Sequence, residues 1–161
     1  MSNVHILEKF NFHLYIISSS EKGPVKIGYS NNPPSRLKEM QTANHEKLYI
    51  WGSISVKELK IVQLIEKLIH FYLKINKTHL RGEFFQITPK LALHIFECFP
   101  IGRKNLFEKI NITKNSIDNV MDIHDLGLKN NIITEDEYDL LQETFDWGDD
   151  DDNYKFINLM S

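Results

Sequence analysis

Glu66 and His70 stand four residues apart in a stretch with helical periodicity, so their side chains point in the same direction. A carboxylate can hold a divalent cation, and a neighbouring imidazole can support that carboxylate or carry a proton. The alternatives are a solvated helix face for Glu66 and a histidine satisfied by its neighbours for His70. Arg36 lies in the first turn of another predicted helix, where its charge opposes the helix dipole, which favours a role other than stability.

The charge of the chain is divided between its two parts. Residues 1–110 contain sixteen Lys and Arg against nine Asp and Glu, a net charge of +7, and residues 111–161 contain three against thirteen, a net charge of −10. Binding to phosphate groups requires a basic surface, whereas DNA would repel the acidic part. Two solvated surfaces of opposite sign are the alternative, and charge alone does not decide between them.

The composition is that of a soluble globular protein, with 42% hydrophobic and 25% charged residues among 161. The start of the chain has no basic segment followed by an apolar one, and no run of eighteen apolar residues occurs. We therefore expect an intracellular protein, cytoplasmic or nuclear, that is not secreted and has no membrane partner. The single cysteine, Cys98, cannot form an intramolecular disulfide and has no Cys or His at the spacing of a zinc site.

Strand and helix signals follow one another in the N-terminal part. Residues 12–18 and 25–29 are rich in β-branched and aromatic residues and enclose a turn with Gly23-Pro24, which predicts a β-hairpin. Asn32 followed by Pro33 predicts the start of a short helix that carries Arg36. Residues 48–54 predict a third strand.

A long amphipathic helix is predicted next. Ser55-Val56-Lys57-Glu58 has the form of a capping box, and apolar residues recur at helical spacing as far as Ile75. The opposite face of this helix is left to Gln63, Glu66, Lys67, His70 and Lys74. Residues 82–87 predict a short strand or turn, and Thr88-Pro89 predicts another helix, which ends near Phe99.

The remaining sequence, residues 113–161, predicts an acidic helical C-terminal region. A helix over 117–126, a turn over 127–133 and a helix that starts at the Thr134–Glu137 capping box and runs to about Phe145 form a predicted helical hairpin. Such a hairpin is small and needs the main body to pack against. Four consecutive acids follow at residues 149–152.

Six short motifs occur in the order found in GIY-YIG nucleases, and the chain most resembles the phage-type branch of that superfamily, which is found in phage and viral enzymes among others. The motifs are Leu14-Tyr15-Ile16, Lys26-Ile27-Gly28-Tyr29-Ser30, Asn32 with Arg36-Leu37, Gln41-Thr42-Ala43-Asn44, Glu66 with His70, and Gly82-Glu83-Phe84-Phe85. The resemblance covers about residues 12–88. It implies an α+β domain over residues 10–100, with a three-stranded antiparallel sheet flanked by helices, and a DNA endonuclease.

The resemblance also implies roles for individual residues. Tyr15 corresponds to the tyrosine that orients or deprotonates the attacking water, Arg36 to the arginine that holds phosphate oxygens, and Glu66 to the ligand of one Mg²⁺ or Mn²⁺ ion. The expected catalytic set is Tyr15, Lys26, Tyr29, Arg36, Glu66 and His70. The expected DNA contacts are Lys26, Arg36 and Lys38.

Two departures from the family pattern bear on these roles. The first motif reads His-Leu-Tyr in place of Gly-Ile-Tyr, and Lys26 stands where many relatives have tyrosine. Lys26 would be a phosphate-binding point charge, and Tyr29 would fill part of the space of the missing phenol. Glu83 and the two phenylalanines after it are interpreted as structural.

Two other functions remain open. One is a GIY-YIG-fold protein that binds nucleic acid with weak or no catalysis, which the altered first motif favours. The other is a protein-interaction module that works through the acidic tail, whose sequence weakly resembles the short helical hairpins appended to other domains. The charge division further suggests that the tail shields a basic cleft until DNA displaces it. The oligomeric state is left open.

Overall fold

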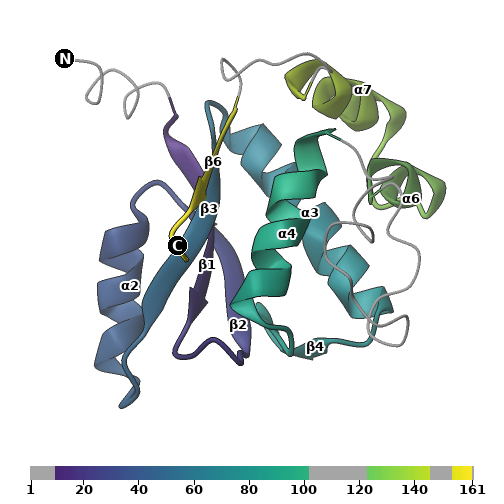
Figure 1. Cartoon of the computed structure of the whole chain (residues 1–161). Helices are drawn as coiled ribbons and strands as arrows, with labels where there is room; N and C mark the ends of the chain where they lie inside the picture. The colour runs from purple at the N-terminus through teal and green to yellow at the C-terminus, as the bar shows by residue number, and fades with distance from the viewer. Residues whose placement is uncertain (1–9, 102–122, 146–153, 161) are drawn as a thin grey trace.

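A six-stranded antiparallel sheet forms the centre of the computed structural model, which describes residues 10–101, 123–145 and 154–160 (Figure 1). Its strands lie in the order β4-β5-β2-β1-β3-β6. They are β1 Phe12–Ser18, β2 Val25–Ser30, β3 Tyr49–Val56, β4 His79–Arg81, β5 Phe84–Phe85 and β6 Tyr154–Asn158. The α+β class is as predicted, but the expectation of three strands is wrong, because short strands extend the sheet at both edges.

Strand β6 is an element of the C-terminal region that the sequence pattern did not predict. It pairs with β3, with Phe156 opposite Ile54, and lies beside it along its length (Figure 1). The partner of this short strand is about a hundred residues away in the chain, so the local pattern could not reveal the pairing. The run of four acids at residues 149–152 lies outside the described residues.

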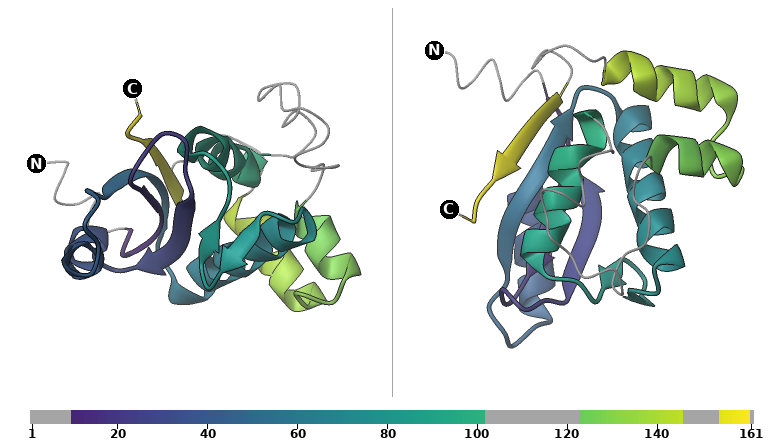
Figure 2. Two further views of the ribbon diagram at one scale, coloured as in Figure 1. Left: turned by 90° about the horizontal axis from the view of Figure 1, so that it is seen from below. Right: turned by 45° about the vertical axis from the view of Figure 1, so that its right-hand side comes forward.

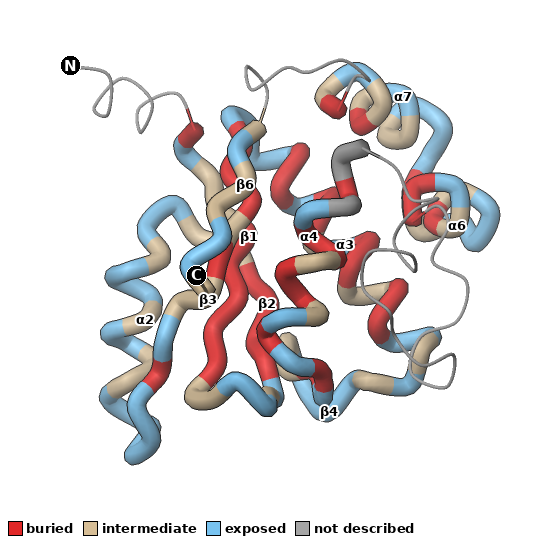
Figure 3. The backbone as a smooth tube through the Cα atoms, in the orientation of Figure 1, coloured by how far each residue is buried: buried red, intermediate tan, exposed pale blue. Residues whose placement is uncertain are grey.

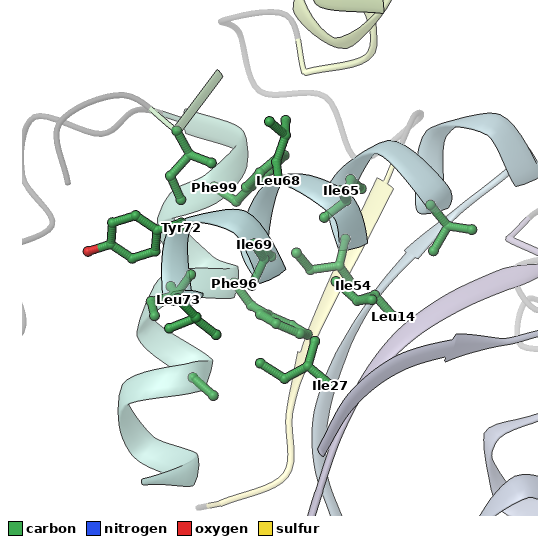
Figure 4. Packing of buried hydrophobic residues seen from close by; sticks show 14 of the residues in the cluster. Leu14, Ile27, Ile54, Ile65, Leu68, Ile69, Tyr72, Leu73, Phe96 and Phe99 are labelled. Carbon is green, nitrogen blue, oxygen red and sulfur yellow. The ribbon is translucent and has the colours of Figure 1, made fainter. Parts of the chain in front are cut away.

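Helices cover the two faces of the sheet (Figures 1 and 2). On one face lies α2 (Pro33–Thr42), which packs Leu37 and Met40 against Tyr15 and its neighbours. On the other lie α3 (Leu59–Ile75) and α4 (Pro89–Ile101), which enclose the main core with the strands. Figure 4 shows α3 in this core, and Figure 3 shows that β1 and β2 are the most completely buried strands while α2 is largely exposed.

The start of α2 is as predicted, and the start of α3 is not. The Asn32 side chain accepts a hydrogen bond from the Ser35 backbone nitrogen at 3.1 Å, with proline at the first helical position. The predicted capping box at Ser55 is absent, because β3 continues through Val56 and α3 begins only at Leu59. The Ser55 hydroxyl, held in the sheet between β1 and β6, instead makes a 2.6 Å hydrogen bond with His13 Nδ1.

The C-terminal hairpin consists of α6 (Ile123–Lys129) and α7 (Glu135–Thr144). The capping box of α7 is confirmed by reciprocal hydrogen bonds of 3.1 and 2.9 Å between Thr134 and Glu137. The predicted turn over 127–133 starts too early, since α6 continues to Lys129, and residues 117–122 of the predicted first helix lie outside the described part.

Gly127 and an ion pair attach this hairpin to α3. A Cβ at Gly127 would overlap the side chain of Leu68 in the core, so the glycine lets α6 approach α3 closely. Lys60 of α3 contacts Glu137 of α7 at 2.6 Å. None of the helices in the described ranges is long and apolar enough to cross a membrane.

Candidate active site

A cleft of about 510 Å³ opens where β2 extends past the end of β5. Strand β5 pairs with Val25 and Lys26 of β2. Next to this pairing, the Ile27 backbone nitrogen donates a hydrogen bond to the Glu83 backbone oxygen at 3.0 Å. Beyond that point the edge of β2 faces α3. The cleft is lined by Tyr15, Tyr29, Ser30, Asn31, Asn32, Ser35, Arg36, Glu39, Glu66 and Glu83.

Tyr15 lies at the bottom of the cleft on β1, opposite Gly28 of β2. A Cβ at Gly28 would lie 2.8 Å from the phenol oxygen and 3.0 Å from Glu83 Oε2, so the absence of a side chain makes room for both groups. Burial raises the pKa of Tyr15, and the carboxylates of Glu83 and Glu66 act in the same direction, while a hydrogen bond with Arg36 opposes the rise. The phenol is therefore protonated at neutral pH.

Arg36 reaches the cleft from the first turn of α2. Its Nη1 donates to Glu39 Oε2 at 2.8 Å, and its guanidinium lies near enough to the Tyr15 phenol for each group to influence the pKa of the other. The bond to Glu39, the bond to Tyr15 and their charges raise the pKa of Arg36, so it stays cationic. About half of the side chain is exposed, which leaves donors of its planar fork accessible to an anion in the cleft.

Glu66 extends from α3 toward the open edge of β2. Desolvation and the nearby Glu83 carboxylate raise its pKa to about 7, while Lys26 and the backbone N–H of Tyr29 partly offset the rise. Its Oε2 atom is buried without a hydrogen-bond partner among the described residues. A carboxylate in this state gains stability from a proton or a cation beside it.

Glu83 is a member of the site that the sequence did not identify. It receives a hydrogen bond of 2.6 Å from Lys26 Nζ, lies against the pair formed by Tyr15 and Gly28, and is near enough to Glu66 to raise the pKa of that carboxyl. The structural interpretation of Glu83, Phe84 and Phe85 suits the two phenylalanines, which form strand β5, and leaves out the part that Glu83 has in the cleft. The signal in the sequence was the place of this acid in the Gly82-Glu83-Phe84-Phe85 motif.

Lys26 is nearly buried, and its ammonium group is directed to Glu83 while lying 5.6 Å from the centre of the Phe84 ring. Its charge therefore compensates the two glutamates. Lys26 and Gly28 are two residues apart in β2 and so lie on one face of the sheet, the face that also carries the Tyr15 side chain of β1. This shared face brings Lys26 to the site, although Lys26 does not line the cleft.

The other predicted residues lie at different distances from the cleft. Tyr29 lines it, and its hydroxyl accepts a hydrogen bond from Gln63 at 3.1 Å. His70 lies outside it, where its Nε2 contacts the Ile27 carbonyl oxygen at 2.7 Å and its ring packs on Phe85 at 4.9 Å between centroids. Burial lowers the pKa of His70. Lys38 is exposed on α2 and does not line the cleft.

The donor set fits one hard cation. The described residues contain no group of three or more His, Cys, Asp or Glu side chains arranged to hold a metal ion. Glu66 and Glu83 nevertheless provide two adjoining carboxyl groups, one with an unpartnered buried oxygen. Mg²⁺ suits such a pair because it takes oxygen ligands, keeps several of its waters and completes its shell with substrate phosphate.

Comparison with known proteins identifies one family. No curated protein and no solved structure matches the chain. The T5orf172 domain model matches residues 12–100, more than half of the chain, and this span contains every residue that lines the cleft. That domain belongs to a GIY-YIG/HNH-like endonuclease superfamily. The chain is therefore a member of the T5orf172 domain family, a nuclease-like family.

Proposed function

We propose that the chain is a divalent-metal-dependent nuclease that hydrolyses phosphodiester bonds of DNA in the cleft between β2, α2 and α3. The observation that carries the proposal is the lining of one cleft by Tyr15, Arg36 and Glu66, which come from three separate elements. Phosphodiester hydrolysis needs a group that orients the nucleophile, a cationic group for the phosphate oxygens and a carboxylate for a metal ion, and these three side chains meet those needs. The Lys26-Ile27-Gly28 form of the second motif favours the phage-type branch of GIY-YIG nucleases.

Arg36 binds the phosphate. Its guanidinium is accessible from the cleft and carries a permanent charge, and its present partner Glu39 is exposed and can be exchanged for a substrate oxygen. Two parallel donors of the fork fit two oxygens of one phosphate. The scissile phosphate is thereby held in the cleft that the Tyr15 phenol also lines.

Tyr15 orients the reactants and keeps its proton on the phenol oxygen. The raised pKa makes the tyrosinate inaccessible near neutral pH, so the phenol acts as a hydrogen-bond donor rather than as a strong base. Packing of the ring beneath α2 fixes its orientation, since the residue is 1% exposed. This favours the orienting role over deprotonation of the attacking water.

Glu66 and Glu83 would hold one Mg²⁺ or Mn²⁺ ion. Such an ion supplies Lewis-acid stabilisation of the charge that develops on the phosphate oxygens. Glu66 offers the unpartnered oxygen, and Glu83 is held in place by Lys26. Lys26 lowers the repulsion between the two carboxylates and so helps both to be ionised together.

A plasmid assay tests the proposal. Supercoiled DNA is incubated with the full chain in Mg²⁺, Mn²⁺ or EDTA, and the same is done with Glu66→Gln, Arg36→Ala and the control Glu46→Gln, which removes an exposed carboxylate that does not line the cleft. We expect metal-dependent nicking that falls by roughly 100-fold or more in the two site variants and is unchanged in the control.

Two results would contradict the nuclease. One is nicking that persists equally in Glu66→Gln and Arg36→Ala, which would indicate a contaminating enzyme. The other is DNA binding without cutting in any metal, which would establish the binding-protein alternative.

A further inference from the structure

A second hollow, of about 550 Å³, adjoins the cleft along the outer side of α3. We call it the α3 groove. Its floor is the polar stripe of α3, in which residues 63, 66, 67, 70, 71 and 74 recur at intervals of three and four and so share one face of the helix. The other lining residues are Tyr29 of β2 and Ile132 of the C-terminal hairpin.

The α3 groove adjoins the cleft. Tyr29 and Glu66 line both hollows, so these two residues mark the boundary at which a strand bound in the cleft would enter the groove. Lys67 and Lys74 are separated by seven residues of helix, which corresponds to about 10 Å along its axis. This length is about three nucleotide steps of a stacked strand.

The chemistry of the groove fits a nucleic acid strand. Lys67 and Lys74 are exposed and project from the helix face that lines it. Phe71 lies between them in the sequence and is half-buried, and Tyr29 forms the wall nearest the cleft. Cations interleaved with aromatic rings bind single strands, because the cations hold phosphates while the rings stack on bases that are free of a complementary strand.

The C-terminal hairpin completes the groove from outside the T5orf172 match. Ile132 follows Asn131, whose φ of +60° turns the chain between α6 and α7, and the Ile132 nitrogen bonds the Gly127 oxygen at 2.9 Å. The close packing of Gly127 on Leu68 sets the hairpin at a fixed distance from α3. Glu137 of the hairpin pairs with Lys60 of α3 at 2.6 Å, which ties α7 to the helix that forms the groove floor.

We propose that the α3 groove binds an unpaired DNA strand on one side of the scissile phosphate, with Lys67 and Lys74 on phosphates and Phe71 on a base. This inference rests on the proposed nuclease function, because that function places the scissile phosphate in the cleft beside the groove. The preferred substrate is then DNA with a single-stranded segment, such as a flap, a tail or a gap, in place of a continuous duplex.

Binding measured without cutting tests the groove separately from catalysis. Fluorescence anisotropy is recorded in EDTA with the full chain and a labelled twelve-nucleotide single strand, and with a blunt duplex of the same sequence. The double variant Lys67→Ala/Lys74→Ala is compared with Lys22→Ala/Lys90→Ala, which removes the same charge from exposed positions outside both hollows. We expect the groove variant to bind the single strand roughly tenfold more weakly, with a smaller salt dependence, and the control to change less than about twofold.

Phe71→Leu tests the aromatic contact while keeping an apolar side chain in the groove lining. We expect roughly fivefold weaker binding of the single strand and little change for the duplex. Equal weakening by the groove and control pairs, or a wild-type preference for blunt duplex, would overturn the proposal. If the protein cuts no DNA but still binds a single strand through the groove, the nuclease proposal is contradicted and the groove proposal is supported.

Discussion

The phenol oxygen of Tyr15 lies directly over Gly28 of the neighbouring strand, so close that a Cβ at that glycine would be 2.8 Å from it. The two residues are opposite each other in the β1–β2 pairing. Glu83 shares the same space at 3.0 Å. The glycine of the second motif therefore has a packing reason: it lets a phenol and a carboxylate occupy the position of a side chain.

Gly28→Ala is expected to displace the phenol and destabilise the fold. The added methyl group meets a buried ring beneath α2, and overpacking of this kind costs about 1–3 kcal/mol. Urea denaturation measures the loss, and nicking activity should fall along with it. Tyr15→Phe removes the closest atom, so Gly28→Ala should cost less in the Tyr15→Phe background than in the wild type. An equal cost in both backgrounds would show that the phenol is not what the methyl group meets.

Glu66→Gln is expected to stabilise the metal-free protein increasingly as pH rises above about 4.5. The folded-state pKa of about 7 lies above the ordinary value of 4.5, so the folded protein binds the proton more tightly and the carboxylate weakens the fold progressively as pH rises from about 4.5 through 7. Discounted for solvent screening, the effect is about 1–2 kcal/mol, or about 3–6 °C in Tm, at pH 8.5.

Thermal denaturation in EDTA at pH 5 and pH 8.5 provides the measurement for Glu66. At pH 5 the folded-state carboxyl is protonated and the effect has only begun to develop, so the difference in Tm should be a small fraction of that at pH 8.5. The groups that set the effect are Glu83, which opposes ionisation of Glu66, and Lys26, which favours it. A difference in Tm that is the same at both pH values would contradict the assignment.

Glu83→Gln is expected to weaken binding of Mn²⁺ by roughly tenfold, because one of two carboxylates is lost while Lys26, its partner at 2.6 Å, keeps its positive charge beside the site. Calorimetric titration with Mn²⁺ at pH 8 gives the affinity, and Glu46→Gln is the control. Full Mn²⁺ affinity in Glu83→Gln, with loss only in Glu66→Gln, would mean that Glu83 serves solely to position Lys26.

Local signals predicted the elements that carry the site, whereas long-range pairing determined the rest. The cap at Asn32, the periodic face of α3 and the capping box of α7 involve residues within a few positions of one another, and all three are found. The pairing of β6 with β3 and the approach of Glu83 to Lys26 each depend on residues far apart in the chain, which a pattern of local propensities does not contain. The predicted capping box at Ser55 does not form, because Ser55 is paired in strand β3 and α3 begins only at Leu59.

Gly127→Ala is expected to loosen the C-terminal hairpin from α3. In an isolated helix the substitution would stabilise α6 by about 1 kcal/mol, since alanine has the higher helix propensity. Here the added methyl group would overlap Leu68, which is completely buried and surrounded by core side chains, and overpacking costs about 1–3 kcal/mol. The packing effect exceeds the propensity gain, so we expect a net loss of about 1 kcal/mol in urea denaturation. Because Ile132 lines the α3 groove, the same variant should bind a single DNA strand more weakly while keeping its affinity for Mn²⁺. A more stable variant with unchanged DNA binding would mean that Leu68 rearranges and that Gly127 does not set the distance between hairpin and groove.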